Sequence, residues 1–245
     1  MLRSDVRLLV YPFDNPLGGY YMMLPGETVQ QVLNQDKDED LRLFLMQKLY
    51  VSCRKICLMW KAGDEAIVAE QSFYNTTIHE SPALFGEDAI NVHYHLEAMI
   101  LFARSCLDVA SVLFSTLLFQ FPSSSKKDSF NDFLKQFIKI FPDHHLTEAF
   151  LNLREDKTSW LSALCGTEKG RSIRDKIAHQ TEFPIEYVEL NERSQKESPV
   201  VIVGDTYIPL SIFIDELRHN LISHYIDIEN FIIECRQTTS NRNSI

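Results

Sequence analysis

The residues best suited to phosphate chemistry lie in one short stretch, 171–180. Arg174 supplies a cation that does not deprotonate, and His179 supplies an imidazole that titrates near neutral pH. On a helix, Arg171, Asp175 and His179 would lie at i, i+4 and i+8 and share one face. The long side chain of Arg174 would reach the same groove. This set suits phosphodiester cleavage, and it is equally typical of a salt-bridged helix end, because perturbed ion pairs are often structural.

Arg174-Asp175-x3-His179 resembles the Arg-polar-x3-His motif of the HEPN superfamily, the higher eukaryotes and prokaryotes nucleotide-binding domain. The resemblance covers about residues 86–236. It implies a helical bundle and an endoribonuclease that uses no metal and no cofactor. His179 would then act as general base or acid, and Arg174 would stabilise the charge that develops on the phosphoryl oxygens. Asp175 would orient one of these two side chains.

The resemblance further implies a homodimer that shares its active site between two copies of the motif. RNA would be the substrate, and the biological role would be that of a toxin or an antiviral defence effector with an antitoxin or another protein partner. Lys169, Arg171 and Lys176 make this the most basic window of the chain and would hold the RNA backbone. The alternative is a non-catalytic HEPN-like dimerisation or protein-interaction module. A third interpretation, nucleotide binding without hydrolysis, would use the same basic window.

A long apolar helix is predicted over residues 87–120. Its few polar residues recur at helical spacing and form a narrow stripe: Glu97, Arg104, Asp108, Ser111 and Ser115. A narrow polar stripe on a mostly buried helix needs partners, and the helix carrying Arg174 is the expected one. We therefore predict that Glu97, Arg104 and Asp108 support the site, with Glu97 or Asp108 facing the Arg/His pair. The solvent face of an amphipathic helix would give the same pattern.

Composition indicates a soluble, mainly helical protein. Of 245 residues, 45% are hydrophobic and 24% charged, and only eight are glycine. A net charge of −10 argues against nucleic-acid binding over the whole surface and modestly favours the interaction module. Five cysteines without a paired framework, and no apparent signal peptide, indicate the cytoplasm. Arg104 and Asp108 interrupt the most apolar window, 99–119, so we expect a buried core helix and no membrane span.

The predicted fold class is mainly α, a HEPN-like bundle with small β-hairpin additions at the N-terminus and after the Arg/His helix. The domains would be a lead-in of hairpin plus helix over 1–85, a helical domain over 86–236 with a hairpin insertion near 183–208, and a disordered tail over 237–245. Further helices are predicted over 36–61, over 129–140, around Trp160, from a cap at Thr167 through the motif, and from Ser211 to about Cys235. The expected strands are Val6–Tyr11, Tyr20–Leu24, Pro184–Leu190 and Val200–Val203, and Ala66–Tyr74 is expected to be a strand or a loop. Asp143 is expected to cap the start of another helix.

Two pairs of residues, Cys53 with Cys57 and His144 with His145, have side chains of the kinds that bind metal ions. Cys53 and Cys57 lie at i, i+4 on one predicted helix, but no third ligand stands near them in sequence, and free cysteine usually packs in a core. His144 and His145 are adjacent and would point to different sides of a helix. Core packing is therefore the preferred interpretation of the cysteines, and no metal is predicted.

Overall fold

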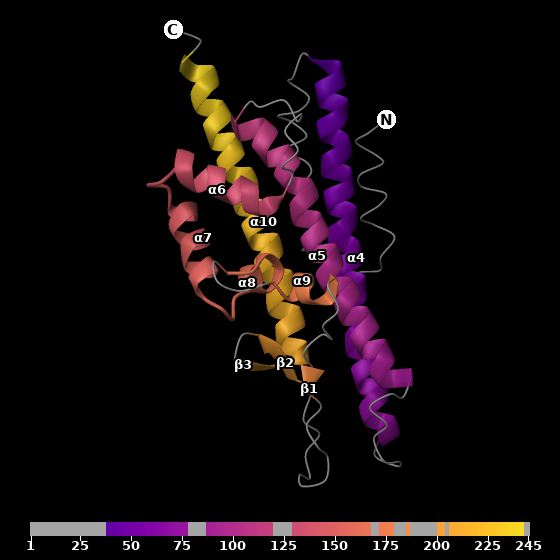
Figure 1. The fold of residues 1–245 in the computed structure, drawn as a ribbon. Helices are drawn as coiled ribbons and strands as arrows, with labels where there is room; N and C mark the ends of the chain where they lie inside the picture. The colour runs from indigo at the N-terminus through magenta and orange to yellow at the C-terminus, as the bar shows by residue number, and fades with distance from the viewer. Residues whose placement is uncertain are drawn as a thin grey trace. The chain divides into compact units, whose positions relative to one another are not determined.

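The structure is a computed structural model that describes residues 38–77, 87–119, 129–167, 172–178, 185–186, 200–203 and 206–242. These residues are mainly helical, which confirms the mainly α character that was predicted (Figure 1). The helices are α4 (Glu39–Thr77), α5 (Glu87–Phe119), α6 (Phe130–Ile140), α7 (His145–Glu155), α8 (Trp160–Cys165), α9 (Ile173–Ala178) and α10 (Leu210–Arg242). The strands are β1 (Ile185–Glu186), β2 (Val200–Val203) and β3 (Thr206–Pro209).

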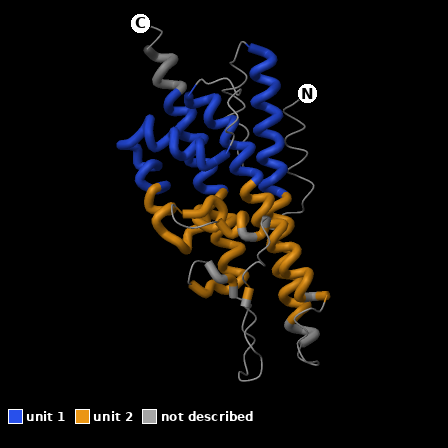
Figure 2. The backbone as a smooth tube through the Cα atoms, in the orientation of Figure 1, with its two compact units in different colours: residues 1–57, 105–150, 222–245 blue, residues 58–104, 151–221 orange. Residues whose placement is uncertain are grey.

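The chain divides into two compact units, each built from several stretches (Figure 2). Unit 1 comprises residues 1–57, 105–150 and 222–245, and unit 2 comprises residues 58–104 and 151–221. The helices α4, α5 and α10 each contribute a segment to both units. The predicted boundary after residue 85 and the predicted N-terminal hairpin lie outside the described residues and stay predictions.

Aromatic side chains fill the core of unit 1. The predicted helix over 129–140 is confirmed as α6, and the Ser129 side chain caps it by accepting a hydrogen bond from the Asp132 N–H. Phe133 and Phe137 are buried, and the Phe137 ring centroid lies 5.5 Å from that of Phe231 on α10. Ile140, the last residue of the helix, is 46% exposed.

Unit 2 contains the predicted hairpin after the motif. β1, β2 and β3 form one antiparallel sheet in that order, with Val201 paired to Ile185 on one side and to Ile208 on the other. Val201, on the central strand, is fully buried. The described part of β1 is shorter than the predicted strand over Pro184–Leu190, of which residues 187–190 lie outside the described part of the chain.

The helix α4 continues well past its predicted end at Lys61, so the prediction of a strand or loop over Ala66–Tyr74 is wrong. Ala69 and Phe73 are both buried and stand four positions apart, so this stretch presents a helical face to the core. The apolar spacing of the first half of α4 therefore extends through the second half.

Gly63 lies within α4, where glycine weakens a helix. Arg218 of α10 is buried and places its guanidinium against this glycine, so that a Cβ at position 63 would lie 2.5 Å from Nη2 and 2.8 Å from Cζ. Nη2 donates to the Trp60 carbonyl and, at 2.8 Å, to the Asp64 carboxylate. Cζ also stands 4.7 Å from the centroid of the Trp60 ring. The glycine therefore makes room for a buried cation.

Replacing Gly63 with alanine is expected to destabilise the protein despite the better helix propensity of alanine. Forcing the pinned Arg218 guanidinium aside costs about 1–3 kcal/mol, and the propensity gain returns about 1 kcal/mol at most. Urea unfolding measures the difference. In an Arg218→Ala background the same substitution is expected to stabilise, because the space is open. Stabilisation of the otherwise unchanged protein by Gly63→Ala would contradict the account.

The helix α7 begins after His144, so the prediction that Asp143 caps it is wrong. The His144 carbonyl accepts from the Thr147 N–H at 2.9 Å, and its ring Nδ1 lies 3.3 Å from the Leu146 N–H. An acceptor Nδ1 must be unprotonated. Burial, together with the neighbouring His145, lowers the pKa of His144 and keeps that nitrogen available.

The last helix, α10, carries its predicted apolar stripe in buried positions: Ile214, Leu217, Leu221, Tyr225, Ile228 and Ile232. It ends at Arg242, beyond the predicted end near Cys235, so most of the tail predicted as disordered is helical. Polar composition alone suggested fraying, but a helix that is already anchored by its buried face extends at little cost per residue. Residues 243–245 lie outside the described chain.

Among the described helices, Ala89–Phe119 of α5 is long and apolar enough to cross a membrane by length and composition alone. Most of its apolar window is buried within the protein, including Leu96, Ile100 and Leu107. That burial is typical of the core helix predicted from the sequence.

Candidate functional site

The helix α9 carries the predicted motif and is short. The Ser172 hydroxyl accepts a hydrogen bond from the Asp175 N–H at 3.0 Å and caps the helix. The predicted cap, Thr167, lies before the described helix, so that prediction is wrong. Ser172 and Ile173 are buried and anchor the start of α9, which packs against α8. α8 ends at Gly166, whose φ of 76° suits a residue without a side chain and turns the chain away.

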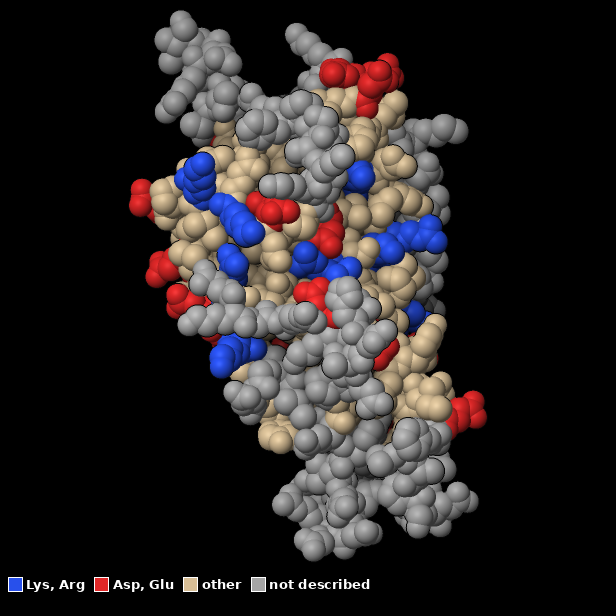
Figure 3. All heavy atoms as spheres, viewed as in Figure 1, with Lys and Arg blue, Asp and Glu red and all other residues tan. Residues whose placement is uncertain are grey.

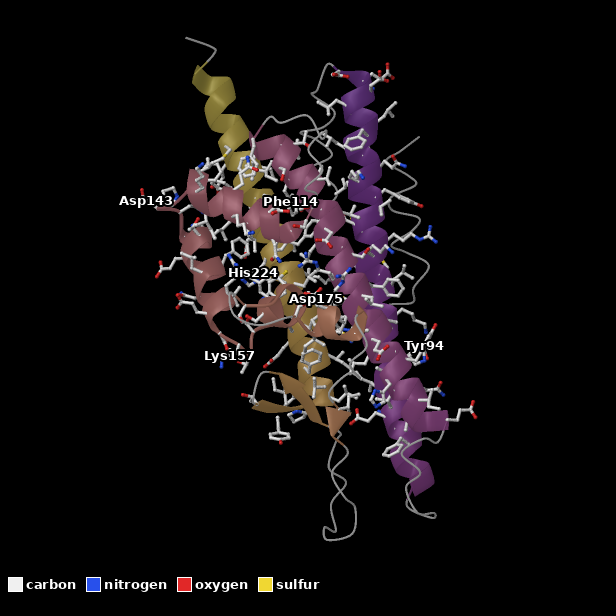
Figure 4. The ribbon with its side chains drawn as sticks, in the orientation of Figure 1. Tyr94, Phe114, Asp143, Lys157, Asp175 and His224 are labelled. Carbon is white, nitrogen blue, oxygen red and sulfur yellow. The ribbon has the colours of Figure 1, made fainter. Side chains whose placement is uncertain are left out.

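Arg174 and Asp175 form an ion pair on α9, with Arg174 Nη1 3.0 Å from Asp175 Oδ1. The two side chains are 40% and 38% exposed, so the pair lies at the surface. Figure 4 labels Asp175 on its helix. Burial raises the pKa of Asp175, but the Ser172 hydrogen bond, Arg174 and the charge of Arg104 together outweigh it and lower the pKa. Asp175 is therefore ionised at neutral pH.

Arg104 joins this site from α5. Its Nη1 lies 2.7 Å from Cys165 Sγ and 3.5 Å from the Leu164 carbonyl oxygen, both at the end of α8. From there its charge stabilises the ionised carboxyl of Asp175. The site therefore gathers two arginines and one carboxylate from α5 and α9 within unit 2, with a thiol of α8 holding one arginine.

The other two predicted supporting residues lie elsewhere. Asp108 Oδ1 accepts a hydrogen bond from the Phe130 N–H at 3.0 Å, so in unit 1 it satisfies a free donor at the start of α6. Glu97 is half-buried, and burial raises its pKa. Of the predicted polar stripe on α5, Arg104 is the residue whose charge is shown to act on the motif.

Several predicted residues cannot be placed in this geometry. His179, Lys169 and Arg171 lie outside the described residues. Lys176 lies on α9, but only its backbone belongs to the described structure. Their predicted roles in catalysis and RNA binding stay predictions.

The cysteine and histidine pairs that resemble metal ligands in the sequence lie in surroundings that do not favour a metal ion. Cys53 and Cys57 are buried in unit 1, and burial raises the pKa of Cys57 to about 11, which disfavours a metal-binding thiolate. The His144 ring centroid lies 4.2 Å from those of both His145 and Phe231, in an aromatic cluster. The described part of the chain contains no group of three or more His, Cys, Asp or Glu side chains arranged to hold a metal ion.

The charge distribution places further limits on what the site can bind. In the described part of the face shown in Figure 3, basic and acidic side chains are interspersed and form no extended basic field. Among the described residues of that face, a ligand with many phosphates would meet no continuous stretch of positive charge. No family model, no curated protein and no solved structure matches this chain.

Proposed function

We propose that the chain is a HEPN-like endoribonuclease that cleaves RNA without a metal ion. The observation that supports the proposal is that Arg174 pairs with Asp175 at a half-exposed position, where the charge of Arg104 also acts on the carboxylate. Guanidinium groups suit phosphate because they stay charged and present paired donors. His179, five positions after Arg174, would supply the group that transfers protons.

In the proposed reaction, the 2′-hydroxyl oxygen attacks the adjacent phosphorus while the bond to the 5′-oxygen breaks. His179 removes the proton from the 2′-hydroxyl while water protonates the leaving 5′-oxygen, or it protonates that oxygen while water accepts the 2′-hydroxyl proton. Arg174 stabilises the charge that builds on the non-bridging oxygens. Asp175 positions Arg174 through the 3.0 Å ion pair. The products are a 2′,3′-cyclic phosphate and a 5′-hydroxyl.

The resemblance to the HEPN superfamily also suggests an oligomeric state and a biological role. Two copies of the motif would meet in a homodimer in the cytoplasm, and the nuclease would serve as a toxin or antiviral defence effector, controlled by an antitoxin or another protein partner. The basic residues Lys169, Arg171 and Lys176 would hold the RNA backbone on either side of the reacting phosphate.

The second candidate is a non-catalytic interaction module, and an apolar face of α5 favours it. Ile90, Tyr94 and Leu101 are 56%, 66% and 41% exposed. Their spacing of four and seven residues places them on one side of the helix. Exposed large apolar side chains that lie together are typical of a surface that binds protein. In this alternative the Arg174–Asp175 pair only stabilises α9.

Incubation of the purified protein with end-labelled single-stranded RNA, with and without a chelator, tests the primary proposal. We expect equal cleavage in both conditions and none of the matched 2′-O-methyl RNA, because that RNA lacks the attacking hydroxyl. Cleavage that stops with the chelator would refute the mechanism. Failure to cleave any of a broad set of RNAs would favour the interaction module.

A further inference from the structure

His144 lies in the turn between α6 and α7, and its side chain caps the start of α7 in unit 1. Its ring Nδ1 lies 3.3 Å from the Leu146 nitrogen and accepts from that N–H, and its carbonyl oxygen accepts from the Thr147 N–H at 2.9 Å. A side-chain acceptor at this position satisfies one of the donors that the first turn of a helix leaves free. Asparagine and serine usually fill this role, and neither gains a proton near neutral pH as an imidazole does.

The same imidazole also packs against α10. Its centroid lies 4.2 Å from that of Phe231 on α10 and 6.3 Å from that of Phe137 on α6. The His144 N–H donates to the Phe141 carbonyl at 3.2 Å, and this carbonyl also accepts from the Thr147 hydroxyl at 2.6 Å. The Phe141 ring centroid lies 4.9 Å from that of Phe231. One side chain therefore links the end of α6, the start of α7 and α10.

We propose that His144 is a pH-sensitive switch, whose neutral imidazole holds the first turn of α7 in place and whose protonation releases it. A protonated Nδ1 is a donor, so it would face the Leu146 N–H and the hydrogen bond between them would be lost. A positive charge at the N-terminus of a helix also opposes the helix dipole. Release would expose Leu146, which is buried in the folded protein. The inference is independent of the proposed nuclease activity.

The charges around the ring set the direction of the switch. Burial and, next, the charge of His145, whose ring centroid is 4.2 Å away, lower the pKa of His144, and Glu234 of α10 opposes them. α6 faces the ring with the uncharged Phe137. Once released, His144 returns to the ordinary pKa of about 6.5, so the released turn binds more protons than the folded one. The stability that the cap contributes is therefore present above about pH 6.5 and lost as the pH falls through the lower pKa of the folded state.

Amide hydrogen exchange, followed by NMR on the full chain, tests the inference. After correction for the intrinsic effect of pH on exchange, we expect the Leu146 and Thr147 amides to exchange about two- to thirtyfold faster as the pH falls from about 7.5 to about 5, which is the range for the loss of an N-cap. His144→Asn keeps an acceptor that does not titrate, so we expect no such rise. His145→Asn is the matched control, since it removes the adjacent imidazole and leaves the cap, and the rise is expected to remain.

The imidazole nitrogen signals of the unchanged protein provide a second measurement, which needs no variant. We expect His144 to carry its proton on Nε2 at neutral pH and to titrate below about pH 6.5. A proton on Nδ1 at neutral pH would overturn the inference. An increase in exchange that is the same in His144→Asn as in the wild type would overturn it as well, because the switch would then lie in another group.

Discussion

Arg174→Gln is expected to lower RNA cleavage about 10²–10³-fold, the loss typical of removing one donor that stabilises transition-state charge. His179→Ala is expected to lower it about 10²–10⁴-fold, the range for a general acid or base. Both follow from the proposed mechanism, in which the guanidinium and the imidazole act on the same phosphate. Rates are measured under single-turnover conditions on the RNA that the wild type cleaves best.

The same variants distinguish a catalytic from a structural role of the motif. Removing one partner from a buried ion network destabilises a protein by about 3–5 kcal/mol, whereas a surface pair contributes about 0–1 kcal/mol. Arg174 and Asp175 are 40% and 38% exposed, so we expect Arg174→Gln to leave the melting temperature nearly unchanged. Arg54→Gln, which removes an exposed cation of α4, is the control for net charge. Full activity of His179→Ala would eliminate the proposed mechanism.

Local patterns predicted the elements whose stability is decided locally. The aromatic periodicity over 129–140 with Ser129 before it specified α6, since both the buried face and the cap lie within the segment. The β-prone run predicted at Val200–Val203 is confirmed as β2, which pairs with the nearby β3. In each case the residues that stabilise the element stand next to one another in the sequence.

The structural features that the sequence did not predict involve contacts between residues that lie far apart along the chain. Gly63 of α4 packs against Arg218, and Arg104 of α5 contacts Cys165, and both partners lie far away in the sequence. The composition of α5 did predict that Arg104 needs a partner near the motif. Which residue of the polar stripe reaches the motif was not predictable, because Asp108 finds its partner at the start of α6 instead. Periodicity identifies a helix face but does not identify the groups that meet it.

A buried carboxyl in unit 1, which no sequence pattern indicated, is expected to make the stability of the protein depend on pH. Glu229 of α10 is only 4% exposed, and its Oε1 has no hydrogen-bond partner among the described residues. Two titratable groups interact electrostatically with Glu229: the Cys53 thiol of α4 and the Tyr225 hydroxyl of α10. The Tyr225 hydroxyl is itself hydrogen-bonded to the Ser52 hydroxyl at 2.7 Å. Burial raises the pKa of Glu229 well above its ordinary value. The folded protein therefore keeps this carboxyl protonated where the unfolded chain ionises it.

The sign of the pH dependence follows from proton binding. Below about pH 4.3, the ordinary pKa of glutamate, Glu229 is protonated in both states and its ionisation does not affect stability. Above that pH the unfolded chain binds fewer protons than the folded protein, so the free energy of unfolding falls by up to about 1.4 kcal/mol per pH unit. The fall continues until the pH reaches the raised pKa of the folded state.

Glu229→Gln removes the ionisation while nearly conserving size, so its advantage over the wild type is expected to grow with pH. We expect the two proteins to differ least near pH 4 and to diverge by up to about 1.4 kcal/mol per unit as the pH rises towards 7. Urea unfolding at pH 4, 5, 6 and 7 measures this, and the difference between the two proteins cancels the titration of all other groups. Glu216→Gln, on the exposed side of the same helix, is expected to show no such divergence. A constant difference across the series would mean that Glu229 is ionised in the folded protein and that a basic group or water reaches its carboxylate.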